Sequence, residues 1–245
     1  KHQTISPNLD SDPRLPTAAP ELTVVLPTYN EAENIPVIVG KIADAMGGIA
    51  HEVIVVDDDS PDGTAAVTRA VAKSHPHVRC IRRVGRRGLS GACLEGMMAA
   101  NAPVVAVMDA DMQHDETRLP VMLAQIADGA DLVIGSRYVD GTRAGGGFHK
   151  KSRAKGSELA TSLANMITGS YTTDPMSGFF MLRRDVADTV AGTVSREGFK
   201  ILFDIVSRRG AELDIREVPF EFRERVAGES KLGFLVTVQF LGLLE

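Results

Sequence analysis

Short apolar runs rich in β-branched residues alternate with segments of helical periodicity along this chain. Such runs predict strands buried on both faces, because a fully covered strand has no need of alternating polar side chains. Apolar residues recur at helical spacing over Ile35–Met46, and a second helix is predicted over Ala65–Lys73. Alternating strands and helices predict an α/β fold, a mostly parallel twisted sheet with helices on both faces. The predicted strands are Leu22–Pro27, Val53–Val56, Val78–Ile81, Val104–Met108 and Leu132–Ile134.

Polar clusters follow four of these strands at their carboxyl ends. In open α/β sheets, ligands bind outside the carboxyl ends of the strands. The clusters bring at least four acids, a tyrosine, an asparagine and an arginine to one rim, which predicts a site large enough for a nucleotide. Each cluster taken alone is also compatible with a hydrophilic loop. The four clusters are Thr28–Glu31 (TYNE), Asp57–Thr64 (DDDSPDGT), Asp109–His114 (DADMQH) and Gly135–Arg137 (GSR).

Asp109 and Asp111 stand directly after the fourth predicted strand. Burying an unpaired carboxylate is costly, so two of them at a strand end indicate a ligand and not packing. Hard oxygen ligands suit Mg²⁺ or Mn²⁺, which proteins commonly hold on a diphosphate with one or two carboxylates. A solvated acidic turn is the alternative for these two residues alone. The neighbouring polar clusters favour the metal.

Composition excludes several other classes of function. The net charge is −5, so no nucleic-acid partner is predicted. No G-x-G-x-x-G or phosphate-cradling P-loop follows the first strand. Cys80 and Cys93 have no ligand-like spacing and fit a reducing compartment. Charge is uneven: Lys73–Arg87 has six Lys or Arg and no acid, and Gly141–Lys155 has five and no acid. These two segments face either solvent or an anionic ligand or membrane.

The ends of the chain differ from its middle. Residues 1–20 contain four prolines and little apolar content, which predicts a disordered arm before a folded domain over residues 21–233. Residues 234–245 are predicted to be an apolar segment that could lie near a membrane. The apolar stretch Phe234–Leu244 is shorter than the about 20 residues that span a bilayer. A core helix, an interfacial helix and the start of a longer segment all remain open for it.

Eight motifs occur in an order that resembles a known family. The stretch of residues 22–233 is similar to the inverting glycosyltransferases of family 2, specifically the dolichol- or polyprenol-phosphate mannose synthases. The resemblance implies a GT-A-type, Rossmann-like fold and identifies residues 21–233 as a glycosyltransferase catalytic domain. The motifs are VVLPTYNEAENI, VVDDDSPDGT, GLSGA, DADMQH and GSR, followed by DPMSGFF at Asp174–Phe180, GFKI at Gly198–Ile201 and GESK at Gly228–Lys231.

The resemblance implies a site for a nucleotide-sugar donor and a divalent metal, Mg²⁺ or Mn²⁺. The metal would lie between Asp109 and Asp111, with Gln113 as a further ligand. Arg225 and Lys231, from a loop that closes on the phosphates, would join Asp109, Asp111 and Arg137 as the catalytic residues. The residues implied for the donor are Pro27, Tyr29, Glu31, Val56, Asp58, Asp109, Ala110, Asp111, Arg225 and Lys231.

An acceptor-phosphate site is implied as well. Its residues are Arg137, Lys150, Arg153 and Ser230. The sequence departs from the family pattern here, because Lys150 stands where an arginine is expected and Ala154 where a serine is expected. The positive charge is kept, but the bidentate guanidinium and the hydroxyl are lost. Arg153 and Ser152 are therefore alternative candidates.

The implied reaction is the inverting transfer of a hexose, mannose from GDP-mannose, to a polyprenyl or dolichyl phosphate. A lipid monophosphate has a second pKa of about 6, so it is largely ionised and needs no general base. Three alternatives stay open: transfer from UDP-glucose or another UDP-sugar, a non-catalytic nucleotide-sugar-binding subunit, and a nucleotidyltransferase. The acceptor implies work at the cytoplasmic face of a membrane, peripherally or through a further anchoring segment. The oligomeric state is left open.

Overall fold

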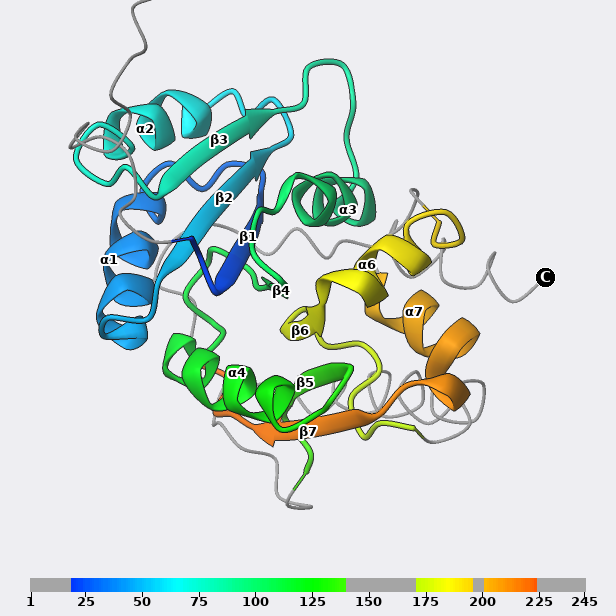
Figure 1. The fold of residues 1–245 in the computed structure, drawn as a ribbon. Coiled ribbons are helices and arrows are strands. Elements are labelled where there is room, and N and C mark those ends of the chain that lie inside the picture. Colours follow the sequence, from blue (N-terminus) through cyan, green and yellow to red (C-terminus); the bar gives the residue numbers. More distant parts are fainter. Residues whose placement is uncertain (1–18, 140–170, 196–200, 224–245) are drawn as a thin grey trace, which may run out of the picture.

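A single seven-stranded sheet organises the molecule. The computed structural model describes residues 19–139, 171–195 and 201–223. The strands lie in the order β3-β2-β1-β4-β6-β5-β7 (Figure 1). All neighbouring pairs are parallel except those that β6 makes with β4 and β5. The predicted mostly parallel α/β sheet is therefore confirmed. The strands are β1 Leu22–Thr28, β2 His51–Asp57, β3 Val78–Arg82, β4 Val104–Val107, β5 Leu132–Ser136, β6 Phe180–Arg183 and β7 Ile215–Pro219.

Helices cover both faces of the sheet, and each face has its own hydrophobic core (Figure 1). Side chains of α1, α2 and α4 pack on one face, and those of α3, α6 and α7 pack on the other. Two short 3-10 turns, η2 and η3, accompany them. The bounds are α1 Ile35–Met46, α2 Thr64–Val71, α3 Leu89–Ala99, η2 Glu116–Arg118, α4 Leu119–Ala127, α6 Arg184–Val190, α7 Ile201–Arg209 and η3 Gly210–Glu212.

The two cores explain why the strands read as unbroken apolar runs. In β1, Val24 and Leu26 face the core of α1 and α4, whereas Val25 between them faces the core of α3. In β2, Val55 and Val56 divide in the same way. All of these side chains are fully buried. A strand covered on both sides has no solvent face, so alternation is absent.

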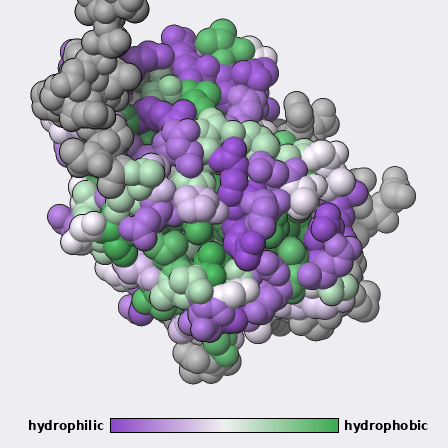
Figure 2. Space-filling view, viewed as in Figure 1, coloured by the Kyte–Doolittle hydropathy of each residue, from purple (hydrophilic) through white to green (hydrophobic). Residues whose placement is uncertain are grey.

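The outer surface is of mixed character. Figure 2 shows hydrophilic and hydrophobic residues interspersed over one face of the molecule. The large hydrophobic residues that are exposed come from separate elements, such as Val37 in α1 and Val121 in α4. Single apolar side chains scattered over a protein surface are normal. Among the residues the structure describes, no helix is long and apolar enough to cross a bilayer.

Three histidines meet at the amino-terminal edge of the sheet, opposite the polar rim. The ring centroids of His51 and His77 are 4.9 Å apart, and those of His75 and His77 are 5.8 Å apart. Burial lowers the pKa of His77 below its ordinary value of 6.5, and repulsion from His51 and His75 lowers it further. His77 is therefore neutral in the folded protein at a pH where the unfolded chain already begins to bind a proton.

Acidification is expected to weaken the fold through His77. Because the folded pKa lies below the unfolded one, the unfolded state binds more protons as the pH falls through 6.5. The contribution of His77 to the free energy of unfolding is therefore fully present above that pH and declines below it. Urea unfolding of wild type and His77→Gln from pH 7.5 to 5 should show a smaller decline in the variant. An equal decline in both proteins would assign the loss to other groups.

Candidate active site

The loops after β1 and β2 are joined to each other by hydrogen bonds. Within the sheet, Pro27 is paired with Val56. Beyond it, the Asn30 N–H donates to Ser60 Oγ (2.9 Å) and the Glu31 N–H donates to Thr64 Oγ1 (3.0 Å). The structure thus brings Pro27, Tyr29, Glu31 and Val56 to the ends of two adjacent strands, the place that the resemblance implied for the donor. Their contact with a nucleotide stays a prediction.

Two aspartates hold the loop after β2. Asp57 is fully buried and accepts hydrogen bonds from the N–H and the hydroxyl of Ser60, at 3.2 and 2.5 Å. It is therefore a turn cap. Asp62 Oδ1 accepts from the Thr64 N–H at 2.9 Å, although the N-cap position of α2 itself is Gly63, with a left-handed φ of 87°.

Asp58 pairs with a buried arginine. Arg83 is only 4% exposed, and its Nη1 donates to one oxygen of Asp58, while the Gly88 N–H donates to the other at 2.7 Å. Arg83 Nε also lies 3.2 Å from Glu95. Asp58 thus fixes the start of α3. The sequence placed Arg83 in a cationic segment facing solvent or an anionic ligand, but its partners are carboxylates of the protein itself. At the end of that segment, Arg87 lies over the ring of Tyr29, 4.9 Å from the centroid.

The turn after β4 presents one carboxylate outward and holds the other inside. The Asp109 side chain is 42% exposed, whereas Asp111 is only 5% exposed. Asp111 Oδ1 accepts a hydrogen bond from the Gln113 N–H at 3.1 Å. Between them Met112 has a left-handed φ of 65°, which reverses the chain direction. Asp109, Ala110, Asp111 and Gln113 therefore share one tight turn.

The imidazole of His114 contacts this turn at Asp109. The Asp109 N–H donates to His114 Nδ1 at 3.0 Å, so the neutral ring carries its proton on Nε2, 3.8 Å from Asp109 Oδ2. The ring stacks on Phe179, with centroids 5.4 Å apart. Burial lowers the pKa of His114 to about 4, although Asp111 acts in the opposite direction. His114 is therefore a neutral structural contact of Asp109 near pH 7, and motif reading had given it no role.

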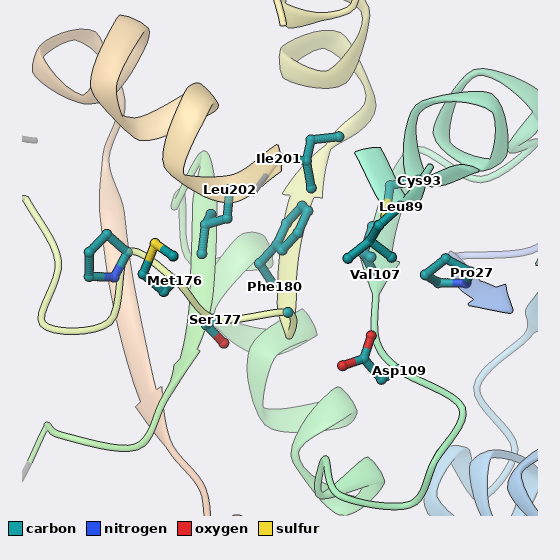
Figure 3. Close-up of a pocket in the computed structure, with 12 residues that line it drawn as sticks. Pro27, Leu89, Cys93, Val107, Asp109, Met176, Ser177, Phe180, Ile201 and Leu202 are labelled. Atoms are coloured by element: carbon teal, nitrogen blue, oxygen red, sulfur yellow. The ribbon is translucent and has the colours of Figure 1, made fainter. Parts of the chain in front are cut away.

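A largely apolar pocket opens beside Asp109 (Figure 3). Its walls come from the ends of β1 and β4, from α3, from the loop before β6 and from the start of α7. Figure 3 shows the Asp109 carboxylate at one end of the lining. Cys93 lies in the wall, and burial raises the pKa of its thiol, so it remains protonated and unsuited to nucleophilic attack. The other labelled lining residues are Pro27, Leu89, Val107, Met176, Ser177, Phe180, Ile201 and Leu202.

Arg137 forms a two-point ion pair with Asp174. Its Nε and Nη2 each lie 2.7 Å from a carboxylate oxygen, and Asp174 is completely buried. Burial opposes the charge of Arg137, but the pair with Asp174 outweighs this and raises its pKa. The guanidinium also lies over the ring of Phe222, at 5.5 Å. Sequence reading named Asp174 within a motif without assigning it this contact.

The loop before β6 connects the β5 end to the Asp109 turn. The Ser177 hydroxyl donates to the carbonyl of Gly135 at 2.7 Å. A Cβ on Gly178 would lie only 3.2 Å from Asp109 Oδ2 and from His114 Cε1. Only glycine leaves the Asp109 carboxylate undisturbed at this position. Ser177 and Gly178 of the DPMSGFF motif therefore lie directly against the end of β5 and the Asp109 turn.

The described residues are suited to a divalent cation that takes some of its ligands from the protein and the others from a substrate. Asp109, Asp111 and Gln113 offer hard oxygen atoms in one turn, one of them on an exposed carboxylate. Within the described ranges, no group of three or more His, Cys, Asp or Glu could hold a metal by itself. An ion here would take its remaining ligands from a diphosphate, as Mg²⁺ and Mn²⁺ commonly do. Lys150, Arg153, Arg225, Ser230 and Lys231 lie outside the described residues.

Solved structures of other proteins share this fold. Glucosyl-3-phosphoglycerate synthase from Mycobacterium tuberculosis, solved with Mn²⁺, UDP-glucose and phosphoglyceric acid, has a TM-score of 0.68 at 20% identity, over 92% of this chain and 78% of that one. The mannosyltransferase PcManGT from Pyrobaculum calidifontis, in complex with GDP-Man and Mn²⁺, has a TM-score of 0.62 at 22% identity, over 89% and 59%. The fold is that of the GT-A glycosyltransferases.

Sequence comparison identifies the family. The model of glycosyl transferase family 2 matches residues 23–191, and the chain belongs to this family. Dolichol-phosphate mannosyltransferase from Saccharomyces cerevisiae is 33% identical over 92% of this chain and 86% of its own length. Polyprenol monophosphomannose synthase from Mycolicibacterium smegmatis is 33% identical over 90% and 84%. The Pyrococcus furiosus dolichol-phosphate mannosyltransferase is 39% identical over 86% of this chain, which spans 59% of that relative's length. The resemblance inferred from the motifs is confirmed.

Proposed function

We propose that this protein transfers mannose from GDP-mannose to a polyprenyl or dolichyl phosphate, with inversion at the anomeric carbon. The observation that carries the proposal is the identity of at least 32% with relatives named for this activity, over most of both chains. The turn of Asp109 and Asp111 beside an apolar pocket supports it. The solved structures leave the base undecided, since the same fold is found with UDP-glucose and with GDP-Man.

One set of residues is proposed to bind the nucleotide-sugar donor, and another set is proposed to bind the acceptor phosphate. Asp109, Asp111 and Gln113 would hold the divalent cation, Mg²⁺ or Mn²⁺, at the donor site. When bound, this ion stabilises the leaving diphosphate as a Lewis acid. Pro27, Tyr29, Glu31, Val56 and Asp58 line the nucleotide site. Arg225 and Lys231 add positive charge to the donor phosphates.

The acceptor phosphate supplies the nucleophile. Its ionised oxygen attacks the anomeric carbon while the bond to the nucleoside diphosphate breaks, so that no side-chain base is required. Asp174 contacts Nε and Nη2 of Arg137, so Arg137 would meet the acceptor phosphate through the N–H groups that face away from Asp174. Lys150, Arg153 and Ser230 complete this phosphate site. The positive charges of Lys150 and Arg153 offset the repulsion between two anionic substrates.

A direct assay tests the proposal. Purified protein with Mn²⁺ or Mg²⁺ is given labelled GDP-mannose or labelled UDP-glucose, and polyprenyl phosphate in detergent. We expect mannosyl lipid from GDP-mannose only. Lipid product from UDP-glucose instead would identify the UDP-sugar alternative. Tight nucleotide-sugar binding without turnover would identify a binding subunit, and full activity on a water-soluble sugar acceptor would overturn the proposed acceptor.

The lipid acceptor also implies contact with the cytoplasmic face of a membrane. The tail of the lipid stays in the bilayer while its phosphate reaches the metal site. The cationic segment Gly141–Lys155 is proposed to approach anionic headgroups, where each Lys or Arg contributes roughly 1 kcal/mol. The apolar residues 234–245 are proposed as a second contact.

Binding of the protein to liposomes should depend on the negative charge of the lipid headgroups. Sedimentation with vesicles of anionic lipid is expected to exceed that with neutral vesicles, and high salt should weaken it. Removal of residues 234–245 should weaken it further. Equal sedimentation with neutral and anionic vesicles would argue against the electrostatic contact.

A further inference from the structure

Arg223 connects two parts of the chain that are far apart in sequence. Its Nη2 lies 2.6 Å from Asp115 Oδ1 and its Nη1 lies 2.7 Å from Glu116 Oε2. Both carboxylates are buried, and they directly follow the DADMQH motif. The arginine therefore holds the segment that follows β7 against the turn proposed to bind the metal. A guanidinium that pairs with two buried acids is a strong and geometrically specific contact.

The main chain of Arg223 continues this contact to Gln113. The Arg223 N–H donates to the Gln113 carbonyl at 3.0 Å, and Gln113 Nε2 donates to the Arg223 carbonyl at 3.3 Å. Gln113 in turn donates its own N–H to Asp111 Oδ1. Asp111, Gln113 and Arg223 thus form one hydrogen-bonded series.

This series has a consequence for the side-chain amide of Gln113. A metal can bind only its oxygen. Because the nitrogen donates to the Arg223 carbonyl, the oxygen points away from Arg223 and the amide cannot turn without losing that bond. Hydrogen bonds that orient a ligand in this way commonly determine metal affinity, and their loss typically costs 10–100-fold.

We propose that Arg223 is a positioning residue for the metal, and that it acts by fixing the amide of Gln113. The inference rests on the proposed function in one respect, that Gln113 is a metal ligand. The pairs with Asp115 and Glu116 hold the Arg223 main chain in place, and the Arg223 carbonyl then orients Gln113.

Another arginine provides a matched control. Arg118 Nε lies 3.4 Å from Asp115 Oδ2, and Lys41 Nζ lies 3.4 Å from Glu116 Oε1. Both help to neutralise the same two acids. Neither of these two contacts involves Gln113. Arg118→Met therefore removes a comparable charge from Asp115 without disturbing the amide.

The test is a double-mutant cycle on Mn²⁺ affinity. The dissociation constant of Mn²⁺ in the presence of saturating GDP is measured from the free-Mn²⁺ electron paramagnetic resonance signal. Arg223→Met is expected to weaken binding about tenfold, and Gln113→Leu by at least as much. The double variant should bind no more weakly than Gln113→Leu alone, because Arg223 acts through Gln113. Arg118→Met should bind as wild type does.

Folding is controlled by a second variant. Arg223→Met leaves two buried carboxylates with less compensation, so Asp115→Asn and Glu116→Gln are added to remove their charges. This triple variant should unfold near the wild-type temperature and still bind Mn²⁺ about tenfold more weakly. Unchanged affinity in the folded Arg223 variants, or fully additive losses in the cycle, would overturn this inference alone. Failure of the wild-type protein to bind Mn²⁺ with GDP would overturn the proposed function as well.

Discussion

Asp111→Asn is expected to reduce mannosyl transfer by at least about a thousandfold, because a Lewis-acidic metal supplies several kcal/mol of charge stabilisation. The change keeps the size of the side chain and an oxygen that can accept the Gln113 N–H. The charge that attracts a divalent cation is lost. Asp111 is only 5% exposed, but it belongs to neither apolar core cluster. The fold should therefore tolerate an amide of the same size at this position.

Three measurements separate loss of metal from loss of fold. Turnover with Mg²⁺ or Mn²⁺ should disappear, metal-dependent GDP binding should disappear with it, and the unfolding temperature without metal should change little. Asp188→Asn, on the outer part of α6, is the control and should leave all three unchanged. Chelation of the wild-type protein should stop transfer reversibly. Near-normal turnover of Asp111→Asn with either ion would show that the metal site lies elsewhere.

The helices and strands that the sequence predicted are those whose residue pattern lies within the element itself. The predicted helix over Ile35–Met46 has the bounds of α1, since its apolar side chains recur on the face that it buries. The strand predicted as Val53–Val56 is longer in the structure, His51–Asp57, because its polar ends also join the ladder. The polar rim was predictable for the same reason: parallel strands that follow helices carry their carboxyl ends to one edge.

The elements that the sequence did not predict depend on partners that are distant in the chain. Strand β6, Phe180–Arg183, has only four residues and lies antiparallel between β4 and β5. Nothing in its own pattern indicates that position. The same holds for Arg83, whose partner Asp58 precedes it by 25 residues. A run of basic residues shows that charge is present, but only the fold decides which of these charges is buried and paired.

The pair of Arg137 and Asp174 gives the second large effect, this time on stability. Arg137→Met leaves Asp174, which has no exposed surface, without its two-point partner. Removal of one partner from a buried ion pair typically costs about 3–5 kcal/mol. We expect the free energy of unfolding, measured in urea, to fall by about this amount. A decrease in the free energy of unfolding of less than about 1 kcal/mol, the value typical of exposed pairs, would show that solvent compensates the charge of Asp174.

A double variant separates this structural role from the proposed role at the acceptor. In Arg137→Met with Asp174→Asn, no uncompensated buried charge remains, so most of the lost stability should return. Transfer should not return with it, because the cation proposed to meet the acceptor phosphate is still absent. The expected signature is a raised KM for polyprenyl phosphate with little change in GDP affinity. If the double variant recovered both stability and a normal acceptor KM, Arg137 would serve the fold alone, and the acceptor phosphate would have to be bound by other cations of the chain.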